Sequence, residues 1–169
     1  GGGFADTITF EITDTLSVAD TVTGGAGTDI LTITDTAGVD ADFTNVTTIE
    51  HLKLGAVTTT VLAAQAQEAG IVNVTVAAAG AYSIDASAMT TALTITGTTG
   101  GTGNVGTIKL GTAADTLVLP ATGSADVITI AAHTLTSTID SITSFITNED
   151  TLTFSGITLT DLRGTGADL

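Results

Sequence analysis

Apolar and polar residues alternate along most of this chain, in short runs separated by turns of glycine or other small residues. One small unit recurs: a turn, an aspartate, any residue, and then alternating apolar and threonine positions. It occupies residues 5–10, 19–22, 28–33, 114–119, 125–130 and 149–154. In each unit every second residue is apolar, so one face of a strand points to a core. The recurrence predicts a repeat architecture built from short strands.

The middle of the chain, residues 43–110, carries a looser repeat. Its apolar strand centres fall near Leu52–Leu54, Val74–Val76, Leu93–Ile95 and Ile108–Leu110. This spacing fits successive coils of a solenoid better than tight hairpins. Hairpin turns favour Asn-Gly or Asp-Gly, and the sequence contains neither dipeptide. We therefore expect an all-β fold, a parallel β-solenoid resembling a β-roll, with a β-sandwich as the alternative.

One segment has helical character. Residues 61–69 are rich in Ala, Gln and Glu, which are good helix formers, and Gly70 is a favoured helix end. We expect a short helix inserted into the solenoid. No linker divides residues 1–169, so we expect a single repeat-built domain, with a soft boundary near the glycine-rich stretch 97–106. The glycine-rich start and the repeat-like end suggest a segment of a longer protein.

Composition supports strands and narrows the possible partners. Threonine fills 39 positions, and its branched Cβ favours a pleated backbone. The chain has 18 acidic and three basic residues, for a net charge of −15. That charge argues against nucleic-acid binding, which needs Lys and Arg to neutralise phosphate. No apolar run is long enough for membrane insertion, and without cysteine there is no disulfide or thiolate metal site.

The acidic residues are open to two interpretations. They can form a solubilising surface, or they can bind divalent cations, since many aspartates stand next to glycine turns. Residues 24–32 read Gly-Gly-Ala-Gly-Thr-Asp-Ile-Leu-Thr and match the nonapeptide pattern G-G-x-G-x-D-x-U-x, where U is a large apolar residue. Glycines allow positive φ, which turns backbone carbonyls toward an ion. Calcium accepts six to eight oxygens in irregular geometry.

On this motif the chain resembles RTX (repeat-in-toxin) proteins and the related calcium-dependent S-layer and adhesin proteins exported by type I secretion. The resemblance implies Ca²⁺ as cofactor, with Asp29 as a ligand and Gly24, Gly25 and Gly27 shaping the loop and giving carbonyls. Partial matches to the motif, or positions facing it, add further candidate ligands: Asp6, Asp20, Asp35, Asp115, Asp126, Asp140 and Asp150. With one complete nonapeptide, we expect a few discrete ions rather than a column.

The resemblance extends to other segments. Residues 43–52 and 84–95 are similar to linking segments between such repeats. Residues 139–152 resemble the closing D-x-I-x-x-F…D-x-L pattern near the ends of RTX arrays.

Catalysis is not expected. The only histidines, His51 and His133, lie far apart in sequence and have no metal partner at fixed spacing. We expect a structural, self-assembling Ca²⁺-binding domain of an extracellular bacterial surface protein, an S-layer or a surface filament. One alternative is an adhesin or carbohydrate-binding module that contacts cell-surface polysaccharide. The other is the RTX tail of a secreted hydrolase.

Overall fold

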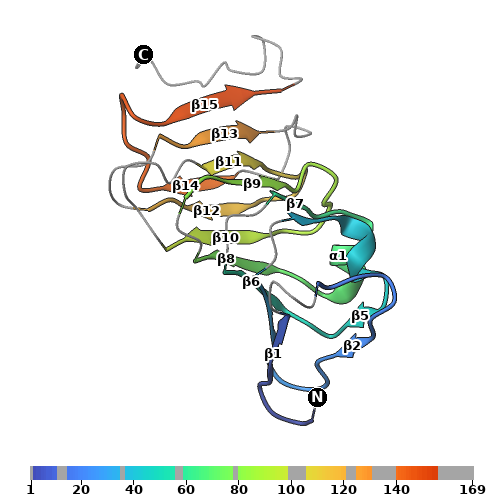
Figure 1. Cartoon of the computed structure of the whole chain (residues 1–169). Helices are drawn as coiled ribbons and strands as arrows, with labels where there is room; N and C mark the ends of the chain where they lie inside the picture. Colours follow the sequence, from blue (N-terminus) through green and yellow to red (C-terminus); the bar gives the residue numbers. More distant parts are fainter. Residues whose placement is uncertain are drawn as a thin grey trace.

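The chain forms a β-solenoid in a computed structural model that describes residues 2–10, 15–34, 37–55, 59–77, 80–98, 106–120, 125–130 and 140–155. Successive coils stack along one axis, and β1 and β15 lie toward opposite ends of the stack (Figure 1). Every strand pairing among the described residues is parallel. The predicted parallel solenoid is therefore confirmed over the β-sandwich.

The first sheet is built from one strand of each coil. Within the described residues its order is β1 (Thr7–Phe10), β3 (Ile30–Ile33), β6 (His51–Leu54), β8 (Asn73–Val76), β10 (Thr94–Gly97), β12 (Thr116–Val118) and β14 (Ser141–Thr143). All these strands share one register, so residues at equivalent positions form columns along the stack.

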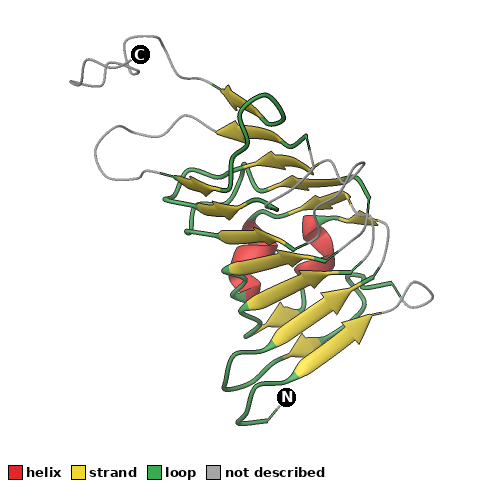
Figure 2. Ribbon diagram, turned by 90° about the vertical axis from the view of Figure 1, so that its left-hand side faces the viewer, coloured by secondary structure: helices red, strands yellow, loops and turns green. Residues whose placement is uncertain are grey.

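A second sheet is built from the other half of the coils that begin with β3 and the later strands of the first sheet. Its order in the described residues is β4 (Ala37–Gly38), β7 (Thr59–Val61), β9 (Tyr82–Asp85), β11 (Gly106–Lys109), β13 (Val127–Ile130) and β15 (Thr151–Phe154). Figure 2 shows the parallel strands stacked along the axis of the molecule.

A further side of the early coils carries short elements outside the two sheets. β2 (Val22–Thr23) pairs with β5 (Val46–Thr47), and a 3₁₀-helix, η1 (Asp40–Phe43), precedes β5. The next coil carries the α-helix α1 (Ala64–Ala69) in the segment between β7 and β8.

Apolar columns fill the space inside the coils. The central inward column of the first sheet consists of Ile8, Leu31, Leu52, Val74, Ile95, Leu117 and Ile142. Its five inner members are buried, whereas Ile8 and Ile142, at the two ends, are only partly buried. Burial of each such side chain contributes about 1.5–3 kcal/mol. The alternation seen in the sequence thus becomes one continuous core.

From β3 onward, each coil contributes one strand to each of the two large sheets in the described residues, which the sequence did not reveal. Equivalent residues of neighbouring coils are 20 to 25 positions apart. Ile95 lies in β10 of the first sheet and Ile108 lies in β11 of the second sheet. The two residues are therefore half a coil apart, whereas the sequence spacing predicts a full coil between them.

Residues 43–52 and 84–95 form parts of coils and not links between repeats. β10 and β11 flank the expected soft boundary near 97–106, of which residues 99–105 lie outside the described part.

The predicted helix is present but shorter than expected. It begins at Ala64 because Val61 belongs to β7, and it ends at Gly70, which has the expected left-handed conformation (φ 99°). The carboxylate of Asp40, one coil earlier, accepts backbone N–H groups of Ala63, Gln65 and Ala66 at 2.7, 3.0 and 3.0 Å. A long-range aspartate therefore caps α1, and the local sequence gave no sign of it.

Candidate metal centre

Acidic residues stand in columns at the position just before the strands. In the first sheet Asp6, Asp29 and Glu50 precede β1, β3 and β6, and Asp115 and Asp140 precede β12 and β14. The shared register of these strands places each carboxylate next to the equivalent position of the neighbouring coil.

The carboxylates in these columns bind the backbone of the neighbouring coil. Asp6 N–H donates to Asp29 Oδ1 at 2.7 Å, and Asp29 N–H donates to Glu50 Oε2 at 2.9 Å. Farther along the first sheet, Leu93 N–H donates to Asp115 Oδ1 and Asp115 N–H to Asp140 Oδ1, both at 2.9 Å. We call each such series a carboxylate ladder.

A second carboxylate ladder runs along the second sheet. Gly106 N–H donates to Asp126 Oδ1 at 2.6 Å, and Asp126 N–H donates to Asp150 Oδ1 at 3.0 Å. In every case the carboxylate belongs to the later coil and the N–H to the earlier one. The ladders therefore have a direction along the solenoid.

The second carboxylate oxygen binds the residue's own turn in three of these aspartates. Asp6 Oδ2 accepts Gly2 N–H at 2.8 Å, Asp115 Oδ2 accepts Gly111 N–H at 2.9 Å, and Asp150 Oδ2 accepts Ile146 N–H at 2.7 Å. Each donor stands four residues before its aspartate. Hydrogen bonds to an ionised carboxylate are about twice as strong as neutral ones. This geometry explains why a turn precedes an aspartate in the sequence repeat.

Asp29 departs from this rule. The residue four positions earlier, Gly25, donates its N–H to Thr48 Oγ1 at 2.8 Å instead. Asp29 is fully buried (0% exposed), and its Oδ2 has no hydrogen-bond partner. A buried acceptor that is left unsatisfied is costly, and more so if it is charged. Among the described side chains, Asp29 Oδ2 is the one buried polar atom in this state.

Gly24, the first residue of the glycine loop 24–27, lies against this oxygen. A Cβ at Gly24 would lie 2.6 Å from Asp29 Oδ2 and 2.0 Å from the Thr48 carbonyl oxygen. Gly25 and Gly27 have positive φ, 104° and 133°, as the nonapeptide pattern predicted. A carboxylate oxygen and a backbone carbonyl oxygen thus converge at the loop, and both are ligand types that calcium accepts.

The predicted ligands divide into separate groups. Asp6 and Asp29 lie together at the loop of Gly24, Gly25 and Gly27. Asp115 and Asp126 lie on different sheets near the other end, where they contact Asp140 and Asp150. Asp20 lies in its own turn, where its Oδ2 accepts the N–H and O–H of Ser17 at 2.9 Å. Asp35 lies outside the described residues.

Glu50 is the acidic neighbour that the sequence prediction missed. Its only sequence signal is its place directly before the strand that starts at His51, the position that aspartate takes in other coils. Within the described residues, no group of three or more His, Cys, Asp or Glu side chains has metal-binding geometry. An ion at the Asp29 loop would therefore take most of its ligands from the backbone and water. The residues fit calcium there better than at Asp6, Asp115 or Asp150, because each of those carboxylates already accepts an N–H on Oδ2.

His51 lies on the outward face of the first sheet. Its Nε2 lies 2.7 Å from Thr75 Oγ1 of the next coil. Burial and the nearby charge of Lys53 lower the pKa of His51. His133 lies outside the described residues.

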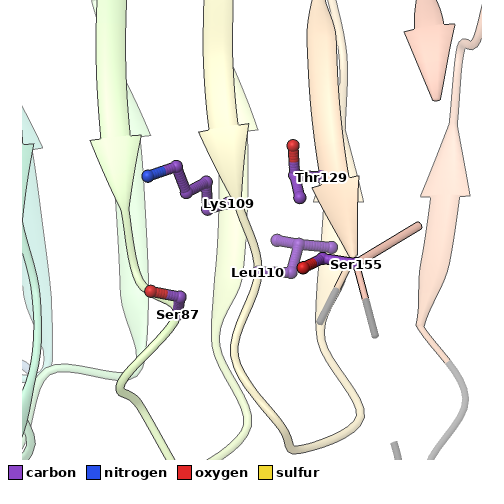
Figure 3. Close-up of a pocket in the computed structure, with 5 residues that line it drawn as sticks. All are labelled: Ser87, Lys109, Leu110, Thr129 and Ser155. Carbon is purple, nitrogen blue, oxygen red and sulfur yellow. The ribbon is translucent and has the colours of Figure 1, made fainter. Parts of the chain in front are cut away.

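A hollow of about 280 Å³ lies where strands of the second sheet end (Figure 3). It is lined by Ser87, Lys109, Leu110, Thr129 and Ser155. Lys109 Nζ forms an ion pair with Asp85 Oδ2 at 2.7 Å, so its charge is already matched. Among the described residues, the lining offers hydroxyl groups but no aromatic ring of the kind on which sugars stack.

Comparisons with known proteins identify no relative. No family model, curated protein or solved structure matches the chain. None of the helices in the described part of the chain is long and apolar enough to cross a bilayer.

Proposed function

We propose that the chain is a structural, calcium-binding solenoid segment of a secreted bacterial surface protein that self-assembles, as in an S-layer or a surface filament. The observation that carries the proposal is Asp29 Oδ2, a fully buried carboxylate oxygen without a donor. It adjoins a glycine loop with the backbone conformation expected of a cation-binding nonapeptide.

Electrostatics favour a cation at this loop. Asp29 lies in a column between Asp6 and Glu50, and the whole chain has only three basic residues. A buried carboxylate without a counter-charge destabilises the fold. Calcium would compensate the charge of Asp29. The Asp29 carboxylate and the Thr48 carbonyl would hold it, together with carbonyls of the glycine loop and water.

The affinity of calcium-binding modules and the acidic charge of the chain both favour calcium binding outside the cell. Extracellular calcium-binding modules have dissociation constants of roughly 10⁻⁴–10⁻³ M, which matches calcium outside cells. A chain of net charge −15 repels itself when compact, and bound calcium relieves this repulsion. We therefore propose that calcium completes folding after export.

Calcium titration of wild type and two aspartate variants tests the proposal. Isothermal titration calorimetry should detect calcium binding by wild type and by Asp115→Asn, but one site fewer in Asp29→Asn. Asp115 is the matched control because it is also a buried ladder aspartate but has an N–H donor on each oxygen. The metal-site proposal is wrong if Asp29→Asn and wild type bind the same number of ions.

A folding measurement tests the link between calcium and structure. Far-ultraviolet circular dichroism of wild type in EDTA should show less strand signal, or a lower melting temperature, than in millimolar calcium. Binding to the native state alone stabilises it in proportion to the logarithm of the free calcium concentration. A melting temperature that does not change between EDTA and calcium would contradict the proposed switch.

A further inference from the structure

Thr48 has an uncommon backbone conformation beside the Asp29 loop. Its φ is 53°, and only two other non-glycine residues in the described part of the chain have positive φ, Ser144 and Asn148. A left-handed conformation is uncommon for any residue with a Cβ and is a genuine outlier for a β-branched one. Thr48 is the β-branched residue among the three. Such strain persists only where the surrounding structure imposes it, and it is concentrated at functional sites.

The Thr48 hydroxyl binds one N–H group of the glycine loop. Its hydrogen is engaged, because Oγ1 donates to the Thr47 carbonyl at 2.7 Å, and its lone pairs can therefore accept. Gly25 N–H donates to this oxygen at 2.8 Å. The preceding N–H of the loop, that of Gly24, donates to the Thr47 carbonyl at 3.1 Å. Two consecutive N–H groups of the loop are thus bound by the next coil and not by Asp29.

The position of Thr48 has an equivalent one coil earlier. The register of β1, β3 and β6 places Gly27 and Thr48 at the same point of successive coils, two residues before Asp29 and Glu50. Both residues have positive φ, 133° for Gly27 and 53° for Thr48. The two positions therefore differ mainly in the side chain that they offer to the preceding coil.

The first coil shows the same turn without a hydroxyl group next to it. Gly2 N–H, which corresponds to Gly25 N–H, faces a coil that carries Gly27 instead of Thr48, and it donates to Asp6 Oδ2 at 2.8 Å. The N–H four residues before the aspartate therefore binds the aspartate of its own turn where no hydroxyl competes for it.

We infer that the Thr48 hydroxyl positions the calcium site, because it holds Gly25 N–H away from Asp29 Oδ2 and so keeps this buried oxygen available for the cation. This role rests on the calcium site proposed above. Without the hydroxyl, Gly25 N–H would donate to Asp29 Oδ2 and close the turn, as Gly2 N–H does at Asp6. The glycines at 24 and 25 give the peptide between them the freedom to turn in this way.

The backbone of Thr48 contributes to the same site. A Cβ at Gly24 would lie 2.0 Å from the Thr48 carbonyl oxygen and 2.6 Å from Asp29 Oδ2, so both oxygens border one small space. Coils on both sides enclose the loop, since a Cβ at Gly27 would lie 2.8 Å from the Phe4 carbonyl oxygen. Thr48 thus offers one candidate ligand, its carbonyl, and keeps a second one available through its hydroxyl.

Three substitutions at Thr48 separate the hydroxyl from the rest of the residue. Thr48→Ser keeps the hydroxyl, Thr48→Val keeps the branched shape without it, and Thr48→Gly removes the side chain and suits the positive φ. All three keep the backbone carbonyl.

Isothermal titration calorimetry with calcium chloride measures the effect on binding. We expect Thr48→Ser to bind calcium as wild type does. The dissociation constant should rise about tenfold in Thr48→Val and Thr48→Gly, equivalent to about 1.4 kcal/mol, because Gly25 N–H then competes for Asp29 Oδ2. Thr48→Gly relieves the backbone strain, so it decides the question if Thr48→Val does not fold. If either hydroxyl-free variant binds calcium as tightly as Thr48→Ser, the inference is overturned.

Melting temperatures in EDTA and in millimolar calcium distinguish positioning from a purely structural role. In EDTA the hydroxyl-free variants should melt no lower than Thr48→Ser, since Gly25 N–H then pairs with a buried oxygen that otherwise has no donor. Calcium should raise the melting temperature of Thr48→Ser more than that of the hydroxyl-free variants. A loss of stability of equal size in EDTA and in calcium would mean that the hydroxyl only joins two coils, and would overturn the positioning role.

The outcomes also separate this role from the calcium proposal. If wild type and all Thr48 variants bind calcium equally well, the positioning role is wrong and calcium binding at Asp29 keeps its own test. If wild type binds no calcium at all, the proposed function fails and the role of Thr48 fails with it.

Discussion

The backbone N–H of Asp115 donates to the carboxylate of Asp140 at 2.9 Å, although the two residues are 25 positions apart in the sequence. Asp126 and Asp150 form the same contact on the other sheet. These bonds join neighbouring coils at the point where a strand begins. The aspartates of the sequence repeat therefore join neighbouring coils through direct hydrogen bonds.

The Asp115→Asn variant tests this structural role. An asparagine has one acceptor oxygen, so either Leu93 N–H or Gly111 N–H would face an NH₂ group in a buried place. We expect a loss of about 1–3 kcal/mol in the free energy of unfolding. Urea denaturation measures it. Glu68→Gln is the control, since it removes the same charge from an exposed residue that makes no hydrogen bond or ion pair in the described structure. Equal stability of the two variants would show that the ladder bonds contribute little.

The loop at Asp29 gives a second prediction, for Gly24→Ala. The added methyl group would lie 2.0 Å from the Thr48 carbonyl oxygen and 2.6 Å from Asp29 Oδ2, so the backbone must shift. We expect a destabilisation of about 1–3 kcal/mol, as for other overpacked sites. Gly3→Ala is the matched control, because nothing lies within 4 Å of its Cβ position. Thermal melting followed by circular dichroism compares the two, and equal melting temperatures would contradict the tight contact.

The periodicity of the sequence was sufficient to predict the fold class, but not to predict which strands make up one coil. The alternation around Leu31 or Leu117 is local and marks a strand directly. Residues 84–95 resemble a linking segment in sequence, yet Ile84 lies in β9 of the second sheet, between the small polar residues Ser83 and Asp85. Alternation alone cannot assign a strand to one of two sheets, because both have inward apolar residues.

The candidate site was predictable only in part, for a similar reason. The nonapeptide pointed to Asp29 and the glycine loop, since its residues are adjacent in sequence. The contacts of Asp29 with Asp6 and Glu50 depend on the number of residues in each coil, which the nonapeptide does not specify. The nonapeptide pattern also has no position for a glutamate. The diversion of Gly25 N–H to Thr48 leaves Asp29 Oδ2 without a donor, and this arises from a tertiary contact between coils.

Asp40 provides a prediction about the helix. Its carboxylate accepts three N–H groups at the start of α1, so Asp40→Ala leaves these donors unpaired. Loss of an N-terminal cap costs about 0.5–2 kcal/mol. We expect a loss in this range by urea denaturation. Asp42→Ala in the same 3₁₀-helix is the control, since Asp42 accepts one exposed N–H, from Val39. A smaller effect of Asp40→Ala than of Asp42→Ala would contradict the long-range cap.

The raised pKa of Tyr82 predicts how the stability of the fold changes at alkaline pH. Burial, together with the charges of Asp126 and Asp150, raises the pKa of Tyr82 above its usual value near 10. The unfolded chain therefore loses the phenol proton at lower pH than the folded chain. Stability from the neutral phenol is fully present below about pH 10 and decreases as the pH rises above it.

Because Tyr82 is the only tyrosine, a single substitution isolates this effect. Tyr82→Phe keeps the ring, which occupies the space next to Gly106, where a Cβ would lie 2.6 Å from Tyr82 Cζ. Wild type should lose more stability than Tyr82→Phe between pH 9 and pH 11, measured by urea denaturation at each pH. Phenolate absorbance of the folded wild type should stay low over the same range and rise on unfolding. Parallel losses in the two proteins, or early phenolate formation in the folded state, would show that the hydroxyl group is accessible to solvent.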